Sequence, residues 1–314
     1  MKKYAVGKFK GSMVALVTPF KDGRIDEAAF ISLCERQIRC GSAALVPCGT
    51  TGEASTLTHQ EQSRLIELSV WAARGRVPVI AGAGSNCTVT TIGMVAEAKR
   101  LGADAVLCIV PYYNRPSQEG LYQHFLSVQS ESNLPVILYD VPKRTGVALE
   151  LETIVRLSEL PNIIGIKDAS GDLARAARMR HYVAPEFLRL CGDDALVPSF
   201  LTLGSQGAIS VTANVVPALC AALHRAWVTY DTAKLQRISS DLDPLNKALF
   251  LESNPVPVKW LLSRLGLIQG ELRLPLVSLN ERFHAQILDS IKPILPAEAE
   301  AMISVDLSRS IAAE

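Results

Sequence analysis

Short apolar runs recur along the chain, and a longer segment with helical periodicity follows most of them. The runs occupy residues 13–18, 43–48, 77–81, 105–109, 135–139, 163–167, 188–191 and 207–211. They show little polar alternation, which is typical of parallel strands buried on both faces. Helical patterns lie between them at 26–39, 59–74, 90–101, 118–130, 150–160 and 172–183. Eight such units predict an α/β fold, a (β/α)8 TIM barrel.

The pattern changes near residue 228, where helical periodicity continues without further apolar runs of this kind. Helices are predicted at 231–242, 245–252, 257–265 and 280–291, whereas 296–314 shows little periodicity. A barrel of this type takes about 250 residues, so 314 residues suffice for one barrel and an appendage. We therefore predict a catalytic barrel at 1–227, a C-terminal helical domain at 228–295 and a poorly ordered tail at 296–314.

The charge balance favours small molecules as partners. Lys and Arg number 32 against 31 Asp and Glu, which gives a net charge of +1. Nucleic-acid-binding proteins and polybasic membrane anchors carry a strong basic field, which this composition lacks. The uncharged stretch 195–223 is interrupted by Pro198, Gly204, Asn214 and Pro217, a pattern that argues against a lipid-facing helix.

The cysteines and the N-terminal residues indicate a cytoplasmic protein. Seven cysteines are dispersed without CxxC pairs and mostly lie in apolar runs, as buried thiols of a reducing compartment do. The first residues are basic, with no apolar segment before Lys8 and Lys10. A secretory signal is therefore not expected.

Polar residues at the ends of the apolar runs are the candidates for chemistry, because the active site of a (β/α)8 barrel lies at the carboxyl ends of its strands. Lys167 ends the sixth run. A lysine at the rim of an apolar interior either forms a Schiff base with a carbonyl substrate or begins a solvated loop. Thr50 and Thr51, between Gly49 and Gly52, either cradle a small carboxylate or form an ordinary turn.

Two further side chains at such ends are candidates. Tyr139 is either a proton carrier, with Thr50 and Tyr113 ordering its hydroxyl, or a core residue with a polar tip. Arg144 either holds a carboxylate through two parallel hydrogen bonds or faces water.

Other chemistries find little support in the sequence. The five histidines are scattered without the spacing of a zinc site, so no metal site is predicted. The chain has no serine-hydrolase GxSxG motif and no glycine-rich nucleotide-binding motif. Asp193 and Asp194 are adjacent, so their side chains point opposite ways and a turn or cap role is expected.

The ordered motifs resemble the dihydrodipicolinate synthase family of Schiff-base pyruvate lyases and aldolases. The resemblance extends over roughly residues 9–292. It is carried by GSMVALVTPF at 11–20, PCGTTGEASTLTHQE at 47–61, VPVIAGAGSN at 77–86, PYYNRPSQEGLYQHF at 111–125, VILYDVPKRTG at 136–146, NIIGIKDASGDL at 162–173, ISVTANVVP at 209–217, NPVPVKW at 254–260 and LRLPL at 272–276.

The resemblance implies a role for each candidate. By position, Lys167 matches the nucleophile, Tyr139 the catalytic tyrosine, and Thr50 the threonine that links this tyrosine to a second one. The second tyrosine, which family members lend across a dimer interface, matches Tyr113. The remaining matches are substrate-binding positions: Thr51 beside the pyruvate carboxylate, Arg144 at the carboxylate of the aldehyde substrate, and Gly192 and Ile209 lining the pocket.

The implied reaction condenses pyruvate with aspartate-β-semialdehyde through an imine on the lysine, in the diaminopimelate route to lysine. The imine itself is the electron sink, so no metal or separate cofactor is expected. The resemblance also implies a homotetramer of tight dimers. Sister aldolases acting on other 2-keto acids share the lysine and the tyrosine, but Arg144 favours the synthase. A non-catalytic homologue would be expected to lack the nucleophile or its proton relay.

Two departures from the family pattern stand out. Asp140 replaces the Asn usual after the tyrosine, and it could either pair with Lys143 or shift neighbouring pKa values. The second departure concerns the cleft through which lysine inhibits regulated members. Its positions match Ala54, Ser55, His59, Gln62, Asn86, Thr90 and Tyr112, and Gln62 and Thr90 differ from the sensitive pattern. We expect weak or absent inhibition by lysine, because the carboxylate that would meet its ammonium is missing at Thr90.

Overall fold

A computed structural model describes the backbone of residues 6–132 and 134–313, and side chains as far as Val305. The chain divides into two compact units. The first, called unit 1, contains the residues before Gly11 together with Pro78–Ile209, and the second, called unit 2, contains Gly11–Val77 and the chain from Ser210 onward. The expected division into a barrel at 1–227 and a helical domain at 228–295 stays a prediction.

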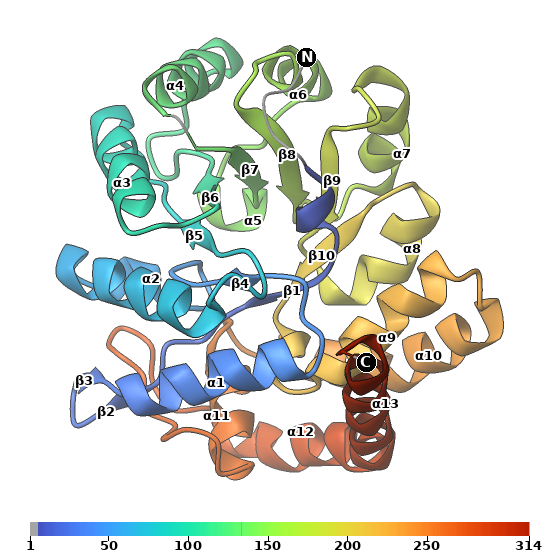
Figure 1. The fold of residues 1–314 in the computed structure, drawn as a ribbon. Coiled ribbons are helices and arrows are strands. Elements are labelled where there is room, and N and C mark those ends of the chain that lie inside the picture. Colours follow the sequence, from blue (N-terminus) through green and yellow to red (C-terminus); the bar gives the residue numbers. More distant parts are fainter. Residues whose placement is uncertain (1–5, 133, 314) are drawn as a thin grey trace. The chain divides into compact units, whose positions relative to one another are not determined.

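Unit 1 carries six of the predicted strands in parallel, each hydrogen-bonded to the next. They are β5 (Ile80–Gly82), β6 (Ala105–Ile109), β7 (Val136–Asp140), β8 (Ile163–Asp168), β9 (Leu188–Cys191) and β10 (Gly207–Ser210), whose last residue falls in unit 2. The helices of this unit are α3 (Thr88–Arg100), α4 (Gln118–Glu131), α5 (Pro142–Thr145), α6 (Leu151–Ser158), α7 (Leu173–Tyr182) and α8 (Val197–Thr202). Figure 1 shows α3, α4, α6 and α7 on the outer side of the strands.

Close packing of β8 against β9 depends on one glycine. A Cβ on Gly165 would lie 2.4 Å from the Cβ of Leu188, so only a residue without a side chain fits there. The strands β7 and β8 are buried along their whole length, as the apolar runs predicted. Their carboxyl ends therefore have a fixed position relative to each other.

Unit 2 begins with a parallel pair, β1 (Gly11–Ala15) and β4 (Leu45–Val46), and the helices α1 (Glu27–Arg39) and α2 (His59–Ala73). A capping box of Thr58 and Glu61 starts α2. Unit 2 also contains a hairpin that was not predicted, formed by β2 (Phe20–Lys21) and β3 (Arg24–Ile25). Its turn residues, Asp22 and Gly23, are a recognised hairpin signal.

The C-terminal part of unit 2 is helical, as predicted. It contains α9 (Pro217–Val228), α10 (Thr232–Ala248), α11 (Val256–Arg264), α12 (His284–Ile291) and α13 (Leu295–Ala313). The prediction of two helices at 231–242 and 245–252 is wrong, because α10 continues through Pro244. Leu242 and Leu245 are both buried, and this apolar face holds the helix together across the proline. The short 3-10 helices are η1 (Val6–Phe9), η2 (Ala54–Thr56), η3 (Asp194–Leu196), η4 (Thr212–Asn214), η5 (Glu281–Phe283) and η6 (Lys292–Ile294).

Helix α13 spans most of 296–314, where the sequence shows little periodicity; the expected poor order of this tail stays a prediction. The position of α13 depends on Glu298, which is only 5% exposed. The Glu298 carboxylate accepts hydrogen bonds from the amides of Ala218 and Leu219, at 3.0 and 2.8 Å, in the first turn of α9. A carboxylate at a helix N-terminus satisfies amides that lack partners inside the helix. Burial raises the pKa of Glu298, and these hydrogen bonds oppose that rise.

The fold class is the predicted one, a (β/α)8 barrel with C-terminal helices: eight parallel strands follow one another in the expected order along the chain. The uncharged stretch 195–223 contains α8, β10 and the start of α9. Within the described residues, no helix is both long and apolar enough to cross a membrane. Six cysteines are buried free thiols, and Cys87 is an exposed one.

A buried ion pair joins the C-terminal region of unit 2 to the loop after β4. Lys259 on α11 is fully buried, and its Nζ lies 2.5 Å from Oε1 of Glu53. The amide of Arg273 donates to Oε2 of Glu53 at 3.2 Å. The Arg273 guanidinium pairs with Glu61 at the start of α2. Two distant segments of unit 2 are thus connected through charges shielded from water.

We predict that Lys259→Met lowers the free energy of unfolding by about 3 kcal/mol, because it leaves the Glu53 carboxylate buried without its cation. Urea unfolding followed by circular dichroism measures the change. The matched control is Lys247→Met, which removes an exposed pair with Asp243 on α10 and should change stability by about 0.5 kcal/mol or less. Equal losses in the two variants would contradict this account.

Candidate active site

The two residues expected to perform covalent and acid–base chemistry lie side by side in unit 1. Tyr139 and Lys167 are paired positions on β7 and β8. Their side chains are 7% and 5% exposed. The Lys167 Nζ lies 4.4 Å from the centroid of the Tyr139 ring. The structure therefore places the Lys167 amine directly over the ring of Tyr139, on two strands that are buried along their whole length.

Gly192 makes room for this lysine. It follows β9, and its amide donates to the carbonyl oxygen of Asp168 at 2.8 Å. A Cβ at Gly192 would lie 2.9 Å from Cε of Lys167 and 2.8 Å from Cβ of Ala169. The backbone thus approaches the lysine side chain more closely than any other residue type allows.

The other candidates of unit 1 lie on neighbouring segments. Ile209 is buried on β10. Arg144 is exposed on the one-turn helix α5, five residues after Tyr139. Tyr113 is 89% exposed and has a left-handed backbone, with φ of 74°. Its amide donates to the carbonyl oxygen of Thr145 at 3.3 Å, so Tyr113 stands next to the helix that carries Arg144.

Thr50 and Thr51 belong to unit 2, in the turn after β4. The turn is closed by the amide of Gly52, which donates to the carbonyl oxygen of Gly49 at 3.0 Å. Thr51 is 3% exposed, and its hydroxyl accepts a hydrogen bond from Nδ2 of Asn254 at 2.9 Å. The hydroxyl keeps its own proton for a further hydrogen bond. Asn254 was not among the candidates from the sequence, although it is the first residue of the motif at 254–260.

The positions expected to bind lysine are divided between the units. In unit 2, Ser55 and His59 are exposed. In unit 1, Tyr112 is 39% exposed, and the carbonyl oxygen of Asn86 accepts from Nδ2 of Asn114 at 2.9 Å. The Gln62 side chain makes a hydrogen bond within unit 2, where its Nε2 donates to the carbonyl oxygen of Ala54 at 3.0 Å.

Thr90, the other departure from the lysine-sensitive pattern, is exposed near the start of α3. Hydrogen bonds from Thr90 lower the pKa of the neighbouring Cys87 thiol. The position therefore offers a hydroxyl and no carboxylate.

Asp140 does not pair with Lys143, the one partner that the sequence suggested for it. Lys143 is exposed, and the partner of Asp140 is Arg175 on α7, at 2.7 Å. Burial raises the pKa of Asp140, and the Arg175 guanidinium opposes that rise. The sequence did not single out Arg175, because α7 carries further arginines at 178 and 180 with no sign of which one faces inward.

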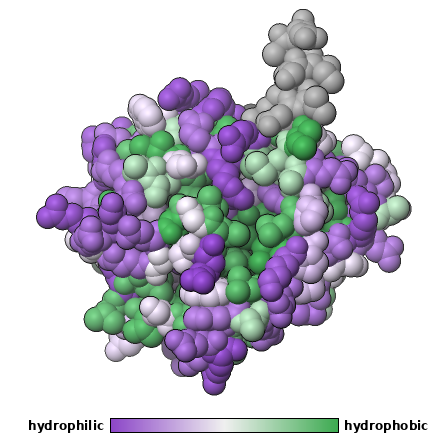
Figure 2. Space-filling model, turned by 90° about the horizontal axis from the view of Figure 1, so that it is seen from below, coloured by the Kyte–Doolittle hydropathy of each residue, from purple (hydrophilic) through white to green (hydrophobic). Residues whose placement is uncertain are grey.

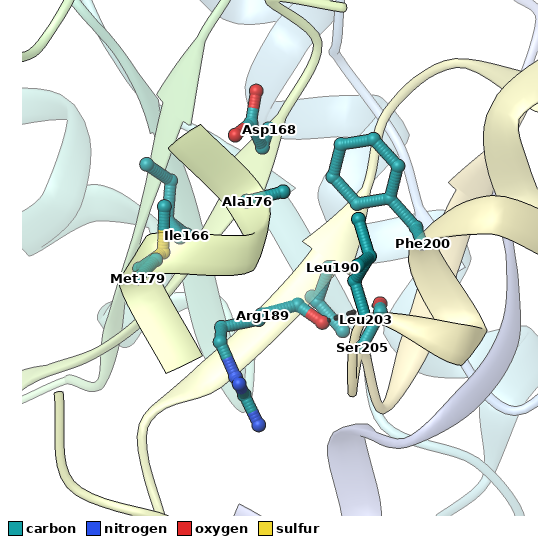
Figure 3. A pocket seen from close by; sticks show the side chains of 9 residues that line it. All are labelled: Ile166, Asp168, Ala176, Met179, Arg189, Leu190, Phe200, Leu203 and Ser205. Carbon is teal, nitrogen blue, oxygen red and sulfur yellow. Dashed lines mark hydrogen bonds between the residues drawn. The ribbon is translucent and has the colours of Figure 1, made fainter. Parts of the chain in front are cut away.

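A small cavity lies behind β8 and β9, between these strands and the helices α7 and α8 (Figure 3). Its volume is about 10 Å³, enough for about one water molecule. Asp168 and Arg189 stand at opposite ends of its lining and point away from each other. The cavity is too small for pyruvate and is not the substrate site.

Among the described side chains, no group of three His, Cys, Asp or Glu residues is placed to hold a metal ion. Asp193 acts as a cap, as expected, because its Oδ1 accepts from the amide of Ala195 at 3.2 Å at the start of η3.

Comparison with known proteins gives one consistent result. The model of the dihydrodipicolinate synthetase family matches residues 8–294. A 4-hydroxy-tetrahydrodipicolinate synthase of Parvibaculum lavamentivorans is 51% identical over 284 residues, covering 90% of this chain and 98% of the relative. The crystal structure of dihydrodipicolinate synthase from Aquifex aeolicus has a TM-score of 0.89 at 40% identity, covering 91% of this chain and 98% of that one.

The structure of a chloride-inhibited dihydrodipicolinate synthase from Acinetobacter baumannii complexed with pyruvate has a TM-score of 0.88 at 43% identity, covering 90% of this chain and 98% of that one. The fold, the buried lysine and these relatives define an enzyme of the lyase class. The chain belongs to the dihydrodipicolinate synthetase family.

We predict that Gly192→Ala slows the reaction of Lys167 with pyruvate by about 100-fold, because the added methyl displaces the lysine side chain. Reduction of the imine with borohydride, followed by mass spectrometry over time, measures this rate. Gly93→Ala is the control, since a Cβ at this exposed position of α3 meets nothing within 4 Å. A Gly192→Ala protein that reacts as fast as the control would show that the close approach is unimportant.

Proposed function

We propose that this enzyme condenses pyruvate with L-aspartate-β-semialdehyde through an imine on Lys167, giving 4-hydroxy-tetrahydrodipicolinate. The observation that carries the proposal is the buried Lys167 with its Nζ 4.4 Å above the Tyr139 ring. The names of the relatives support the same reaction. The product belongs to the diaminopimelate route to lysine.

The chemistry follows from the amine and the tyrosine. The Lys167 nitrogen adds to the keto carbon of pyruvate, and the keto oxygen leaves as water to give an iminium ion. Loss of a methyl proton to a base gives an enamine, whose carbon attacks the aldehyde carbon of the second substrate and forms the new C–C bond. The amino group of that substrate then displaces Lys167 from the imine carbon, which closes the ring and releases the enzyme.

The neighbouring groups have distinct roles in this proposal. The Tyr139 hydroxyl carries protons, with Thr50 and Tyr113 completing the relay. Thr51 orients the pyruvate carboxylate, and the Arg144 guanidinium binds the carboxylate of the aldehyde in a bidentate fork. Gly192 and Ile209 shape the pocket. The iminium nitrogen accepts the electron pair, so the proposed reaction uses no metal and no separate cofactor.

We also propose a homotetramer made of two tight dimers, located in the cytoplasm. The 89% exposure of Tyr113 supports a dimer, because a relay residue left in water by its own chain needs a second copy to be covered. Apolar side chains interrupt the polar surface in Figure 2. Large exposed apolar residues include Val89 and Tyr182 in unit 1 and Leu274 and Val277 in unit 2.

Borohydride trapping tests the proposed function directly. With pyruvate present, we expect reduction to attach the pyruvate carbons to Lys167, and we expect the untreated enzyme to turn over aspartate-β-semialdehyde. Arg144→Ala should still be trapped by pyruvate but lose about 100-fold in kcat/KM for the aldehyde, since a bidentate charged contact is removed.

Lys143→Ala is the matched control, because it removes the exposed cation next to Arg144 and should behave as the wild type. Absence of an adduct on Lys167 would reject the imine mechanism. Trapping without condensation would instead indicate a sister aldolase with another acceptor.

We predict that lysine inhibits the enzyme weakly or not at all, with no half-maximal effect at sub-millimolar concentration. In this chain, Thr90 stands where lysine-sensitive members of the family have a glutamate that meets the lysine ammonium. The missing charged hydrogen bond is worth about 1.5–3 kcal/mol. Steady-state rates at increasing lysine test this expectation. Thr90→Glu should lower the lysine concentration for half-maximal inhibition by about one to two decades. Half-maximal inhibition of the wild type below about 1 mM, the affinity of an interaction of roughly 4 kcal/mol, would refute the prediction.

A further inference from the structure

A buried charge cluster lies directly behind the catalytic pair. Asp140 and Asp168 each follow a catalytic residue in the sequence, and they are themselves paired positions on β7 and β8. Successive side chains of a strand point to opposite faces. The two aspartates therefore face α7, on the reverse side of the strands from Tyr139 and Lys167.

Arg175 joins the two aspartates. Its Nη1 lies 2.7 Å from Oδ2 of Asp140, and its Nη2 lies 2.8 Å from Oδ1 of Asp168. The exposed fractions of Asp140, Asp168 and Arg175 are 0%, 2% and 5%. Arg189, which lines the cavity beside Asp168, points away from it (Figure 3). One guanidinium thus bridges the ends of two strands, out of reach of bulk water.

The same guanidinium also holds the segment that carries Arg144. Nη1 of Arg175 donates to the carbonyl oxygen of Leu149 at 2.6 Å. The amide of Leu149 donates in turn to Oδ1 of Asp140 at 3.2 Å. The segment from Val141 to Leu149 therefore starts and ends at the cluster, with Arg144 between its two ends.

The position of Arg175 is itself fixed by the loop after β8. The amide and hydroxyl of Ser170 donate to Oδ1 of Asp168 at 2.9 and 2.7 Å. Asp172 caps α7, accepting from the amide of Arg175 at 2.8 Å. The amide of Asp172 donates to the Ser170 hydroxyl at 3.1 Å, so the helix start and the strand end are parts of one hydrogen-bonded network. Such a network favours a single placement of the guanidinium.

We propose that Arg175 is a positioning residue for catalysis, acting through Asp140 and Asp168 to align Tyr139, Lys167 and the Arg144 segment. This inference rests on the proposed function. A purely structural cluster would stabilise the folded protein without changing how fast each folded active site works. Rates expressed per active site, counted by borohydride trapping with pyruvate, separate the two roles.

The test uses the full-length enzyme and three variants. Arg175→Met should lower kcat per trapped site by about 100-fold, because misalignment by about 1 Å costs that much. Arg175→Lys keeps a cation that reaches only one aspartate. Its kcat per trapped site should therefore be about tenfold higher than that of Arg175→Met. Asp140→Asn keeps its shape and its acceptor for Leu149 but loses the charge, and it should reduce kcat/KM for the aldehyde more than kcat/KM for pyruvate.

Arg156→Met is the matched control, since it removes an exposed arginine paired with Glu119 in the same unit and should stay within twofold of the wild type. The Arg175→Met and Asp140→Asn effects should be less than multiplicative when combined, because each removes the same contact. If Arg175→Met does not fold, Asp140→Asn and Arg175→Lys decide the question alone.

Wild-type rates per trapped site in Asp140→Asn and Arg175→Lys would overturn the positioning role. Failure of the wild type to be trapped by pyruvate would instead reject the proposed function, which keeps the two failures distinct.

Discussion

The parallel pairing of β7 with β8 is the constraint on which the candidate site depends. Its register puts Tyr139 opposite Lys167 and Asp140 opposite Asp168. Because the side chains of a strand alternate between its faces, this one register assigns the reactive pair to one face and the acidic pair to the other. A shift by one residue would bury the lysine against α7 and expose an aspartate where the amine is needed. Gly165, which brings β9 against β8, helps to fix this arrangement from the other side.

Much of this architecture could be predicted from the sequence. The strand bounds agree with the apolar runs to within about three residues, because parallel buried strands have few alternative patterns. Lys167 was identifiable as a candidate from its place at the end of the sixth apolar run. By contrast, the cation that pairs with Asp140 was not identifiable, since three arginines at 175, 178 and 180 share one helix and only tertiary packing selects among them.

The two differences in the C-terminal helices have a common physical origin. Separate helices were predicted at 231–242 and 245–252, and 296–314 showed little periodicity, yet α10 and α13 are continuous helices. In each case contacts with distant residues outweigh the local preference: buried leucines hold α10, and Glu298 anchors α13 through the amides of α9. The hairpin at 20–25 was missed for a different reason. Its strands have only two residues each, too few to form an apolar run in the sequence.

The contacts that complete unit 2 also set an order of events during synthesis. Ala218 and Leu219 receive their cap from a residue 80 and 79 positions later, and Glu53 meets Lys259 after 206 positions. The ribosome adds roughly 5–20 residues per second, so these partners emerge many seconds apart. Most of unit 1, by contrast, is a continuous stretch of chain whose neighbouring strands are consecutive. The strands β7 and β8, with Tyr139 and Lys167, therefore have their neighbours early in synthesis. The turn with Thr50 and Thr51 gains its contact with Asn254 only when the last quarter of the chain has been made.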